Sequence, residues 1–244
     1  GRIEAVETQA LSPWLDDPAV IEWYRYLNLG YRLPLLAGTD KMSSEVPIGA
    51  VRAYSHLLDD GELTFDAWAE AVRAGRTFVT SGPILELTVD GHEPGDVIAF
   101  SSRARLDVAV RARAAQPVVG AVELVVNGRV VAATQADEPA TELALHETIE
   151  IRAGSWIAAR SRSPFQIESA FTSSMAAHTS PVYVEVRDRP IVPAADDVAV
   201  VETVIAGTRQ WIAELAAVAE PAERARMVRF LDDSLESLRR RAAG

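Results

Sequence analysis

The stretch "AVELVVNGRVV", residues 121–131, decides the fold of the larger part of this chain. Apolar residues recur at every second position from Val122 to Val126, which is the period of a strand that buries one face. Asn127 and Gly128 follow, and this pair favours a two-residue hairpin turn because both residues tolerate a positive φ. The stretch therefore predicts two antiparallel strands joined by a tight turn.

The same period of two appears on both sides of this hairpin. No helical pattern interrupts the segment, and short alternating strands separated by turns are typical of an antiparallel β-sandwich. We therefore expect a β-sandwich over residues 83–190. Its inward-facing positions are predicted to be Leu85, Leu87 and Val89; Leu106, Val108 and Val110; and Val182, Val184 and Val186.

Residues 1–82 have a different pattern. "RIEAVE" (2–7) reads as a strand, residues 18–29 keep helical spacing before Gly30, and "LPLLAG" (33–38) is apolar on both faces. Strand, helix and doubly apolar strand are typical of a βαβ unit with parallel strands. A second helix is expected from the cap residue Thr64 to Gly75. This segment is predicted to be the closing portion of a larger α/β sheet or barrel.

Residues 191–244 are predicted to form a helical hairpin after the proline-bearing linker "RPIVPAADD" (189–197). The apolar positions between Val201 and Leu215 keep helical spacing, and Pro221 is a favoured first residue for the second helix.

Composition excludes several functions. The net charge of −11 disfavours nucleic-acid binding, because binding phosphates needs clustered Lys and Arg. No apolar run approaches the roughly 20 residues that cross a bilayer, so we expect a soluble protein without membrane contact. The absence of cysteine excludes disulfides and thiolate chemistry but leaves the compartment open. The chain begins without an initiator Met or a signal-like segment, so we expect the C-terminal piece of a longer protein.

Asp40 raises a question, because it follows the apolar strand in "LLAGTDKM" (35–42). Thr and Asp after a strand are ordinary turn or cap residues. However, ligands and catalytic groups gather at the C-terminal ends of parallel strands. On the residues alone both interpretations stay open.

The four histidines form no recognisable metal motif, since neither HxH nor HExxH is present. His92 lies in a turn, His56 is expected at the surface, and His146 takes a solvent-facing strand position. His178 is different, because a turn just before a strand could direct its imidazole into a cleft. The residues "TSGP" (80–83) do not form a serine nucleophile elbow, and "GRTFVTSGP" (75–83) lacks the glycine spacing of a phosphate loop.

Five stretches taken in order resemble the CehA/McbA-like metallohydrolases, which are related to the PHP phosphoesterases. They are "WYRYLNLGYRLPLLAGTDKM" (23–42), "PIGAVRAY" (47–54), "AVRAGRTFVTSGPILELTVDG" (71–91), "VVNGRVV" (125–131) and "AHTSPVYVEV" (177–186). The resemblance implies a distorted α/β barrel that holds divalent metals, followed by the β-sandwich.

Asp40 matches the metal-ligating aspartate of the last barrel motif in that family. The resemblance implies zinc, manganese or iron, and a metal-activated water that attacks an ester, carbamate or phosphate substrate. His178, Lys41 and Arg52 are candidates for lining the substrate or contacting its anion.

Two departures from the family pattern limit this hypothesis. The N-terminal HxH ligands would lie before Gly1, and Met42 stands where the family often has His. We therefore expect Asp40 to be one ligand of a site completed elsewhere, and the chain alone to be inactive.

The alternative hypothesis is a non-catalytic binding or accessory protein that uses the β-sandwich. A polymer-binding sandwich would carry an exposed aromatic strip, whereas Trp156, Phe165 and Phe171 are scattered. An incomplete barrel would also expose apolar strand edges, so we expect self-association.

Overall fold

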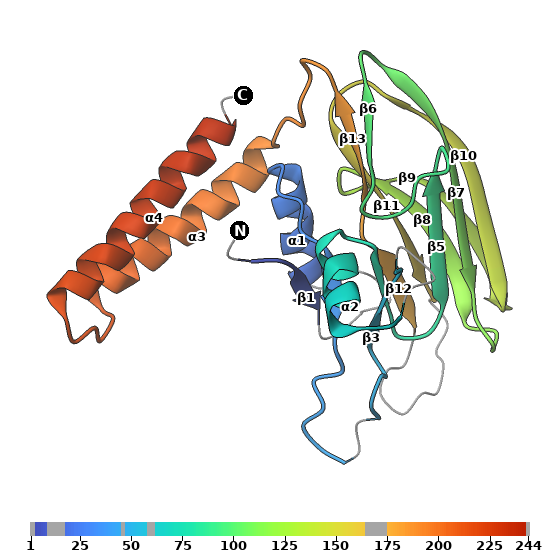
Figure 1. Ribbon diagram of the computed structural model, residues 1–244, viewed down its shortest axis with the longest axis horizontal. Helices are drawn as coiled ribbons and strands as arrows, with labels where there is room; N and C mark the ends of the chain where they lie inside the picture. Colours follow the sequence, from blue (N-terminus) through green and yellow to red (C-terminus); the bar gives the residue numbers. More distant parts are fainter. Residues whose placement is uncertain (1–2, 9–17, 45–46, 58–61, 164–174, 243–244) are drawn as a thin grey trace. The chain divides into compact units, whose positions relative to one another are not determined.

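The computed structural model describes residues 3–8, 18–44, 47–57, 62–163 and 175–242. They divide into two compact units (Figure 1). The larger unit comprises Gly1–Leu27 and Arg32–Pro190, and the smaller comprises Asn28–Tyr31 and Ile191–Gly244. Within the described residues no helix is both long and apolar enough to cross a membrane.

The larger unit consists mainly of β-strands with two helices. Its elements are β1 (Val6–Thr8), α1 (Pro18–Asn28, whose last residue belongs to the smaller unit), β2 (Leu35–Ala37), β3 (Arg52–Ser55), α2 (Phe65–Arg73), β4 (Thr77–Thr80), β5 (Ile84–Val89), β6 (Val97–Phe100), β7 (Ala104–Arg113), β8 (Val119–Val126), β9 (Arg129–Ala140), β10 (Glu142–Ile151), β11 (Ser155–Arg162), β12 (Ala176–Thr179) and β13 (Val182–Val186).

Two sheets pack face to face in this unit. One contains β10, β7 and β5 in that order, all antiparallel, and Figure 1 shows β7 and β10 side by side along their length. The other has eight strands, with β11 at its centre. β8 and then β9 extend from one edge of β11, and β12 and β13 share its other edge. β4 and β3 continue beyond β12, and β6 continues beyond β13.

The inward-facing residues of the two sheets form one apolar core. All nine inward positions predicted from the period of two in 83–190 belong to this core. The predicted turn is present too, because Asn127 and Gly128 have φ of 50° and 81° and Val126 pairs with Arg129. The prediction of an antiparallel sandwich is therefore confirmed, with one exception, since β6 and β13 pair in parallel.

The N-terminal segment differs from its prediction. β1, α1 and β2 do form a parallel βαβ unit, with Val6 opposite Leu35. However, β3 and β4 do not continue that sheet, since they join the large sheet of the sandwich through β12. Among the described residues the strands close no α/β barrel. Pairing with a strand about 100 residues away decides where β4 lies, and the local pattern of 1–82 does not contain that information.

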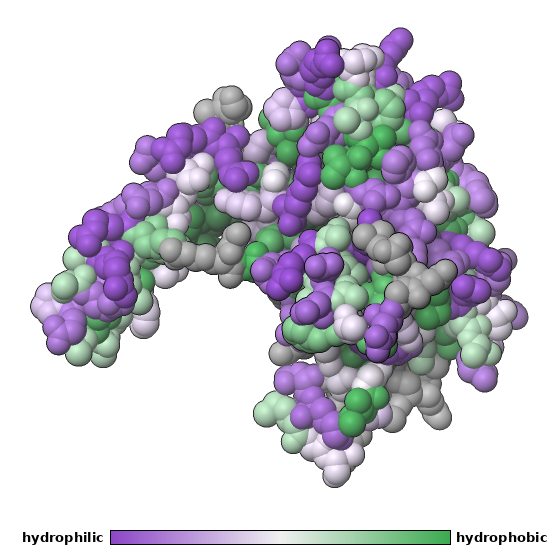
Figure 2. All heavy atoms as spheres, viewed as in Figure 1, coloured by the Kyte–Doolittle hydropathy of each residue, from purple (hydrophilic) through white to green (hydrophobic). Residues whose placement is uncertain are grey.

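The smaller unit contains the predicted helical hairpin, made of α3 (Ala195–Glu214) and α4 (Pro221–Ala242). Arg209 Nε bonds Asp232 Oδ1 at 2.5 Å and Arg239 Nε bonds Glu202 Oε1 at 2.7 Å, so ion pairs join the two helices. Figure 2 shows hydrophobic and hydrophilic side chains interspersed along the hairpin, and Trp211 is 55% exposed.

Candidate binding groove

A groove of about 870 Å³ lies within the larger unit. It borders β5, the start of β4, the end of β3, the loop after β5, and the outward face of β7 and β10. A second hollow of about 730 Å³ borders Thr88, Ala109 and His146, which also line the groove. The two hollows therefore adjoin on the outward face of the three-stranded sheet.

The edge of β5 forms one wall of this groove. All five residues from Ile84 to Thr88 line it, including Leu85 and Leu87, whose side chains lie in the core. Successive strand residues point to opposite faces, so a hollow that touches all five runs along the main chain. Among the described residues, β5 pairs with β7 only.

The hydrogen bonds at the end of β5 show which residues direct their main chain into the groove. Asp90 N–H donates to Asp107 O on the β7 side, whereas Val89 N–H donates to His92 O on the opposite edge. Because these directions alternate along an antiparallel strand, Leu85 and Leu87 share the edge of Val89. The N–H and C=O groups of Leu85 and Leu87 therefore face the groove without a strand partner in the described chain.

An aromatic pair contributes to another wall. The rings of Tyr54 and Phe78 stack with centroids 4.9 Å apart and an interplanar angle of 11°. Arg52 covers Tyr54 with its guanidinium carbon 5.4 Å from the ring centroid. The Tyr54 ring thus has neighbours within its own unit, and Tyr54 remains 40% exposed, so the aromatic pair gives this wall an apolar surface.

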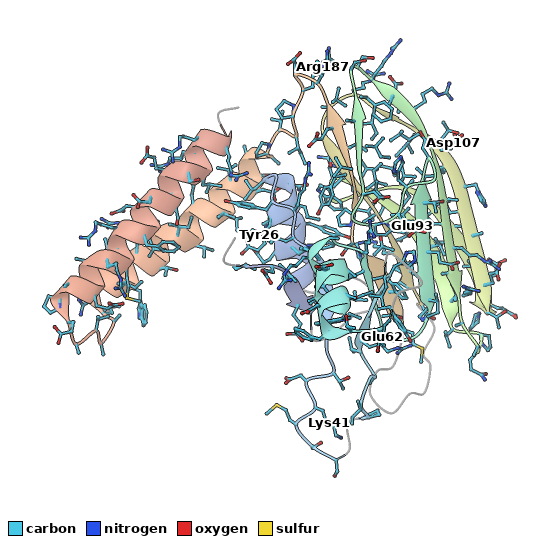
Figure 3. All side chains as sticks on the ribbon, viewed as in Figure 1. Tyr26, Lys41, Glu62, Glu93, Asp107 and Arg187 are labelled. Carbon is cyan, nitrogen blue, oxygen red and sulfur yellow. The ribbon has the colours of Figure 1, made fainter. Side chains whose placement is uncertain are left out.

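The loop between β5 and β6 closes one side of the groove and is firmly held. The carboxylate of Glu93 is hydrogen-bonded to His56 Nδ1 at 2.6 Å, and the main-chain N–H of Glu93 donates to Asp96 Oδ2 at 3.0 Å. Gly95 has φ of +93°, and a Cβ there would lie 2.1 Å from Ala74 O at the end of α2. Only glycine fits this approach, so the loop is fixed against the helix. Figure 3 shows Glu93 beside β5.

The outward face of the sheet gives the groove a small-residue floor between charged borders. Ala109 and Ala144 contribute only methyl groups, and His146 lies directly opposite Ala109 in the pairing of β10 with β7. At the other end Arg111 binds Glu142 through two hydrogen bonds of 3.0 and 2.8 Å. The hydrogen bond from Arg111 lowers the pKa of Glu142, which keeps the pair ionised.

Two polar atoms of the groove residues are enclosed and have no hydrogen-bond partner in the part of the chain that the structure describes. They are Arg76 Nη1 and Ser55 Oγ, and both residues line the groove. The other terminal nitrogen of Arg76, Nη2, is 3.9 Å from Asp96 Oδ1, which is too long for a hydrogen bond. Enclosed donors without an acceptor are rare in native proteins, because each one loses its hydrogen bonds to water and gains none in return.

Asp40, the predicted metal ligand, lies just beyond β2 at the C-terminal end of the parallel pair, and it is exposed with φ of 47°. Thr39 Oγ1 donates to Val51 O and accepts from Gly49 N–H, which ties this loop to the start of β3. The described residues contain no group of three or more His, Asp or Glu side chains able to hold a metal ion. Whether Asp40 binds a metal stays a prediction.

The structure does not gather the predicted substrate-lining residues at one place. Lys41 Nζ donates to Ser43 O on an exposed loop, and Figure 3 shows it well apart from Glu93. Arg52 donates to Gly49 O and Gly82 O, and it borders the groove through Tyr54. A substrate role for Lys41 and Arg52 stays a prediction.

His178, the remaining predicted lining residue, is fully enclosed in β12. Its Nδ1 donates to Thr179 O at 2.8 Å, so its Nε2 accepts from the hydroxyl of Tyr24 at 2.5 Å. The ring also packs edge-on against Trp23 with centroids 5.3 Å apart. Burial lowers the pKa of His178 to about 3 and raises that of Tyr24 to about 12, so both groups are neutral at pH 7.

A buried ionic cluster lies on the same sheet. Glu123 of β8 is 4% exposed and accepts from Arg160 Nε at 2.5 Å and from Arg162 Nε at 2.9 Å. Both arginines come from β11, which pairs with β8 along this stretch. The cluster therefore joins two neighbouring strands of the large sheet.

Sequence reasoning did not identify the groove residues Arg76, Ser55 and Glu93. Each is an ordinary polar residue beside a strand or turn, and no spacing rule connects them. His56 was interpreted as a surface residue and His146 as a solvent-facing one, and both are exposed. Of the three scattered aromatic residues, Trp156 is buried, and Phe165 and Phe171 lie outside the described residues.

Comparison with known proteins finds distant similarity to solved structures. No family model matches the chain, and no curated protein matches it. The CARDB domain of PF1109 from Pyrococcus furiosus, crystallised with di-metal ions, is 18% identical over 43% of this chain and 89% of its own, with a TM-score of 0.28. The solution structure of the same domain is 18% identical over 43% of this chain and 98% of its own, with a TM-score of 0.27. A lytic polysaccharide monooxygenase of Jonesia denitrificans is 16% identical over 57% of this chain and 79% of its own, with a TM-score of 0.26.

These findings correct the relationship inferred from the sequence. The similar structures are CARDB domains and a polysaccharide monooxygenase instead of PHP-related hydrolases, and no family model or curated protein supports the CehA/McbA-like resemblance. The matched stretches are local combinations of helix ends, strands and turns, such as the end of α1 with β2, and such combinations recur in unrelated folds. TM-scores this low carry no argument about function.

Proposed function

We propose that this chain is a non-catalytic binding module whose β-sandwich takes an extended polypeptide segment along the open edge of β5. The observation that carries the proposal is the direction of the main chain at Leu85 and Leu87, whose N–H and C=O groups face a groove of about 870 Å³. An extended peptide supplies the matching alternation of donors and acceptors, and it adds a strand to such an edge.

The surroundings of β5 suit such a ligand. The stacked Tyr54 and Phe78 give an apolar wall, and the small floor at Ala109 and Ala144 leaves room for ligand side chains. Both contributing regions belong to one compact unit, and the loop at Glu93 is held by hydrogen bonds and by Gly95. A preformed groove loses little conformational entropy when it binds.

Amide hydrogen exchange tests this proposal directly. In the free protein, the amides of Leu85 and Leu87 exchange fast, whereas those of Glu86 and Thr88, bonded to β7, are protected. Peptides of about twelve residues, selected from a random displayed library, are expected to slow exchange at Leu85 and Leu87 alone. A library that yields no binder, or binders that leave these two amides unprotected, would refute strand addition at β5.

A pair of alanine variants gives the matched control. Ala144→Trp fills the groove floor, and Ala133→Trp places the same ring on β9, where Ala133 is also exposed. Only Ala144→Trp is expected to weaken peptide binding, by at least tenfold, as measured by isothermal titration calorimetry. Equal weakening by both variants would place the binding surface elsewhere.

The metal-dependent hydrolase inferred from the sequence remains a prediction, for which Asp40 is the single candidate ligand. Its test is the metal content of the purified chain after loading with zinc or manganese, next to an Asp40→Ala variant. Stoichiometric metal that is lost in the variant would favour the hydrolase, and equal metal in both would remove Asp40 from consideration.

A further inference from the structure

The aromatic wall of the groove lies on the inner face of the large sheet, beyond the edge of the small one. Phe78 of β4 packs against the sandwich core, whereas the side chain of Thr77 donates to Leu35 O on the opposite face. Tyr54 stacks on Phe78, so it shares the inner face. Among the described residues β5 is the last strand of the small sheet on this side. Tyr54, at 40% exposure, therefore lacks the covering strand that shields the rest of the core.

A segment paired with the open edge of β5 would continue the small sheet over this wall. Paired residues on neighbouring strands point to the same face, so the two residues opposite Leu85 and Leu87 would point inwards, as these leucines do. Packed sheets lie about 10 Å apart, a distance that inward side chains of both sheets fill together. The inward side chains of a bound segment would thus meet Tyr54 and Phe78.

The chain itself begins such a pairing and then leaves it. Asp90 and Gly91 have φ of 47° and 79°, and across this tight turn Val89 and His92 exchange two main-chain bonds of 2.9 Å. The segment at His92 thus runs antiparallel to β5 along its open edge. Pro94 follows and has no N–H to continue the ladder. The positions opposite the two leucines remain for the bound segment, which limits its inward side chains over the wall to two.

Charge offers this groove little basis for selecting a ligand. Its charged borders are already joined in ion pairs, Arg111 with Glu142, Glu86 with Arg113, and Glu93 with His56. A charged ligand would have to compete with these partners, which offsets much of its gain. The unpartnered Nη1 of Arg76 is enclosed, so a ligand does not reach it. Contact with the exposed apolar surface of the wall has no such competitor.

We infer that the groove selects extended segments in which two apolar side chains, separated by one residue, point inwards onto Tyr54 and Phe78. This inference rests on the proposed function for the way in which the segment is held. The main-chain bonds to β5 are the same for every sequence, whereas burial of the two apolar side chains distinguishes one sequence from another. The residue between them points outwards beside Glu86, which is half exposed, so its identity matters little.

The first experiment determines the pattern from selected peptides. Peptides of about twelve residues that slow amide exchange at Leu85 and Leu87 are expected to share two apolar residues separated by one position. Replacing either by Ser should weaken binding about tenfold or more by isothermal titration calorimetry, and replacing the residue between them should weaken it less than about threefold. Binders that protect both leucines but lack this pattern would overturn the inference and leave strand addition standing. Failure to select any binder would refute strand addition, and the inference with it.

The second experiment assigns the selectivity to the wall. Tyr54→Thr removes the ring but keeps a β-branched side chain on β3, and Val131→Thr is the control on β9, where Val131 is 51% exposed. Only Tyr54→Thr is expected to weaken binding, by about tenfold or more, and the Ser replacement next to the missing ring should then cost less than about threefold. Tyr54→Phe keeps the apolar ring and should bind as the wild type does. Fully additive effects of Tyr54→Thr and the Ser replacement would overturn the inference.

Nuclear Overhauser effects in the wild-type complex test the same contact without any variant. Protons of both apolar side chains of the peptide are expected to lie close to the ring protons of Tyr54 or Phe78, and those of the residue between them are not. A bound peptide whose apolar side chains contact neither ring would overturn the inference, even where Leu85 and Leu87 are protected.

Discussion

The enclosed imidazole of His178 makes a specific prediction about acid stability. Its ring is 0% exposed, and burial, with a further contribution from the positive charge of Arg160, lowers its pKa from 6.5 to about 3. In the unfolded chain the same ring binds a proton near its ordinary pKa of 6.5. Above pH 6.5 the enclosed ring therefore makes its full contribution to the free energy of unfolding. That contribution is lost as the pH falls from 6.5 towards 3.

The size of the effect follows from the two pKa values. Linkage between protonation and folding gives a loss of about 2 kcal/mol between pH 7 and pH 5, and of about 4 kcal/mol by pH 3. His178→Gln removes the titrating ring but keeps a donor and an acceptor for Thr179 and Tyr24. The variant is less stable at pH 7, and its free energy of unfolding should change by far less than 2 kcal/mol between pH 7 and pH 5.

Urea unfolding at a series of pH values measures this difference, and His146→Gln is the matched control because His146 is exposed. The control should keep the pH dependence of the wild type. Parallel curves for wild type and His178→Gln would refute the reasoning, as would an imidazole resonance of His178 that titrates near pH 6.5 in the folded protein.

Three further predictions concern single residues and are measured by urea unfolding at pH 7. Glu123→Gln removes the buried negative charge that Arg160 and Arg162 share and should destabilise the fold by about 3 kcal/mol, whereas Glu86→Gln, which removes the charge of an exposed pair, should cost below about 1 kcal/mol. Ser161→Ala removes an enclosed hydroxyl that has no hydrogen-bond partner among the described residues, so it should leave stability unchanged or raise it by about 1 kcal/mol. Asn127→Ala loses the bond from Trp156 N–H and strains a positive φ, costing about 2 kcal/mol, and Asn127→Gly should recover the part due to strain. A stabilising Glu123→Gln, a strongly destabilising Ser161→Ala or a neutral Asn127→Ala would contradict the corresponding argument.

The sandwich could be predicted from the sequence because its strands follow a local rule. Residues such as Val122 and Leu124 alternate with outward-facing positions, and Asn127-Gly128 fixes the turn and register of β8 with β9. The parallel pair β1 and β2 was predictable for a similar reason, since a helix between two strands favours parallel pairing.

The position of β3 and β4 was not predictable, because it depends on contacts between distant parts of the chain. β4 pairs with β12, where Thr80 lies opposite Ala177, and the local sequence of β4 is compatible with either sheet. The groove has the same origin. Ser55 and Arg76 come together through the pairing of β3 with β4, and β5 becomes an edge because β4 leaves for the other sheet.

β11, at the centre of the large sheet, pairs with β12 and β13, the last two strands that the structure describes. This arrangement has a consequence for how the chain folds during synthesis. β6 pairs with β13, where Val97 lies opposite Tyr183, and β4 pairs with β12. A ribosome therefore releases β4 and β6 long before their partners exist. Contacts so distant in sequence slow folding and leave unpaired strands exposed in the meantime. The growing chain should remain protease-sensitive until residues beyond Val186 have emerged, and then become resistant in a single late step.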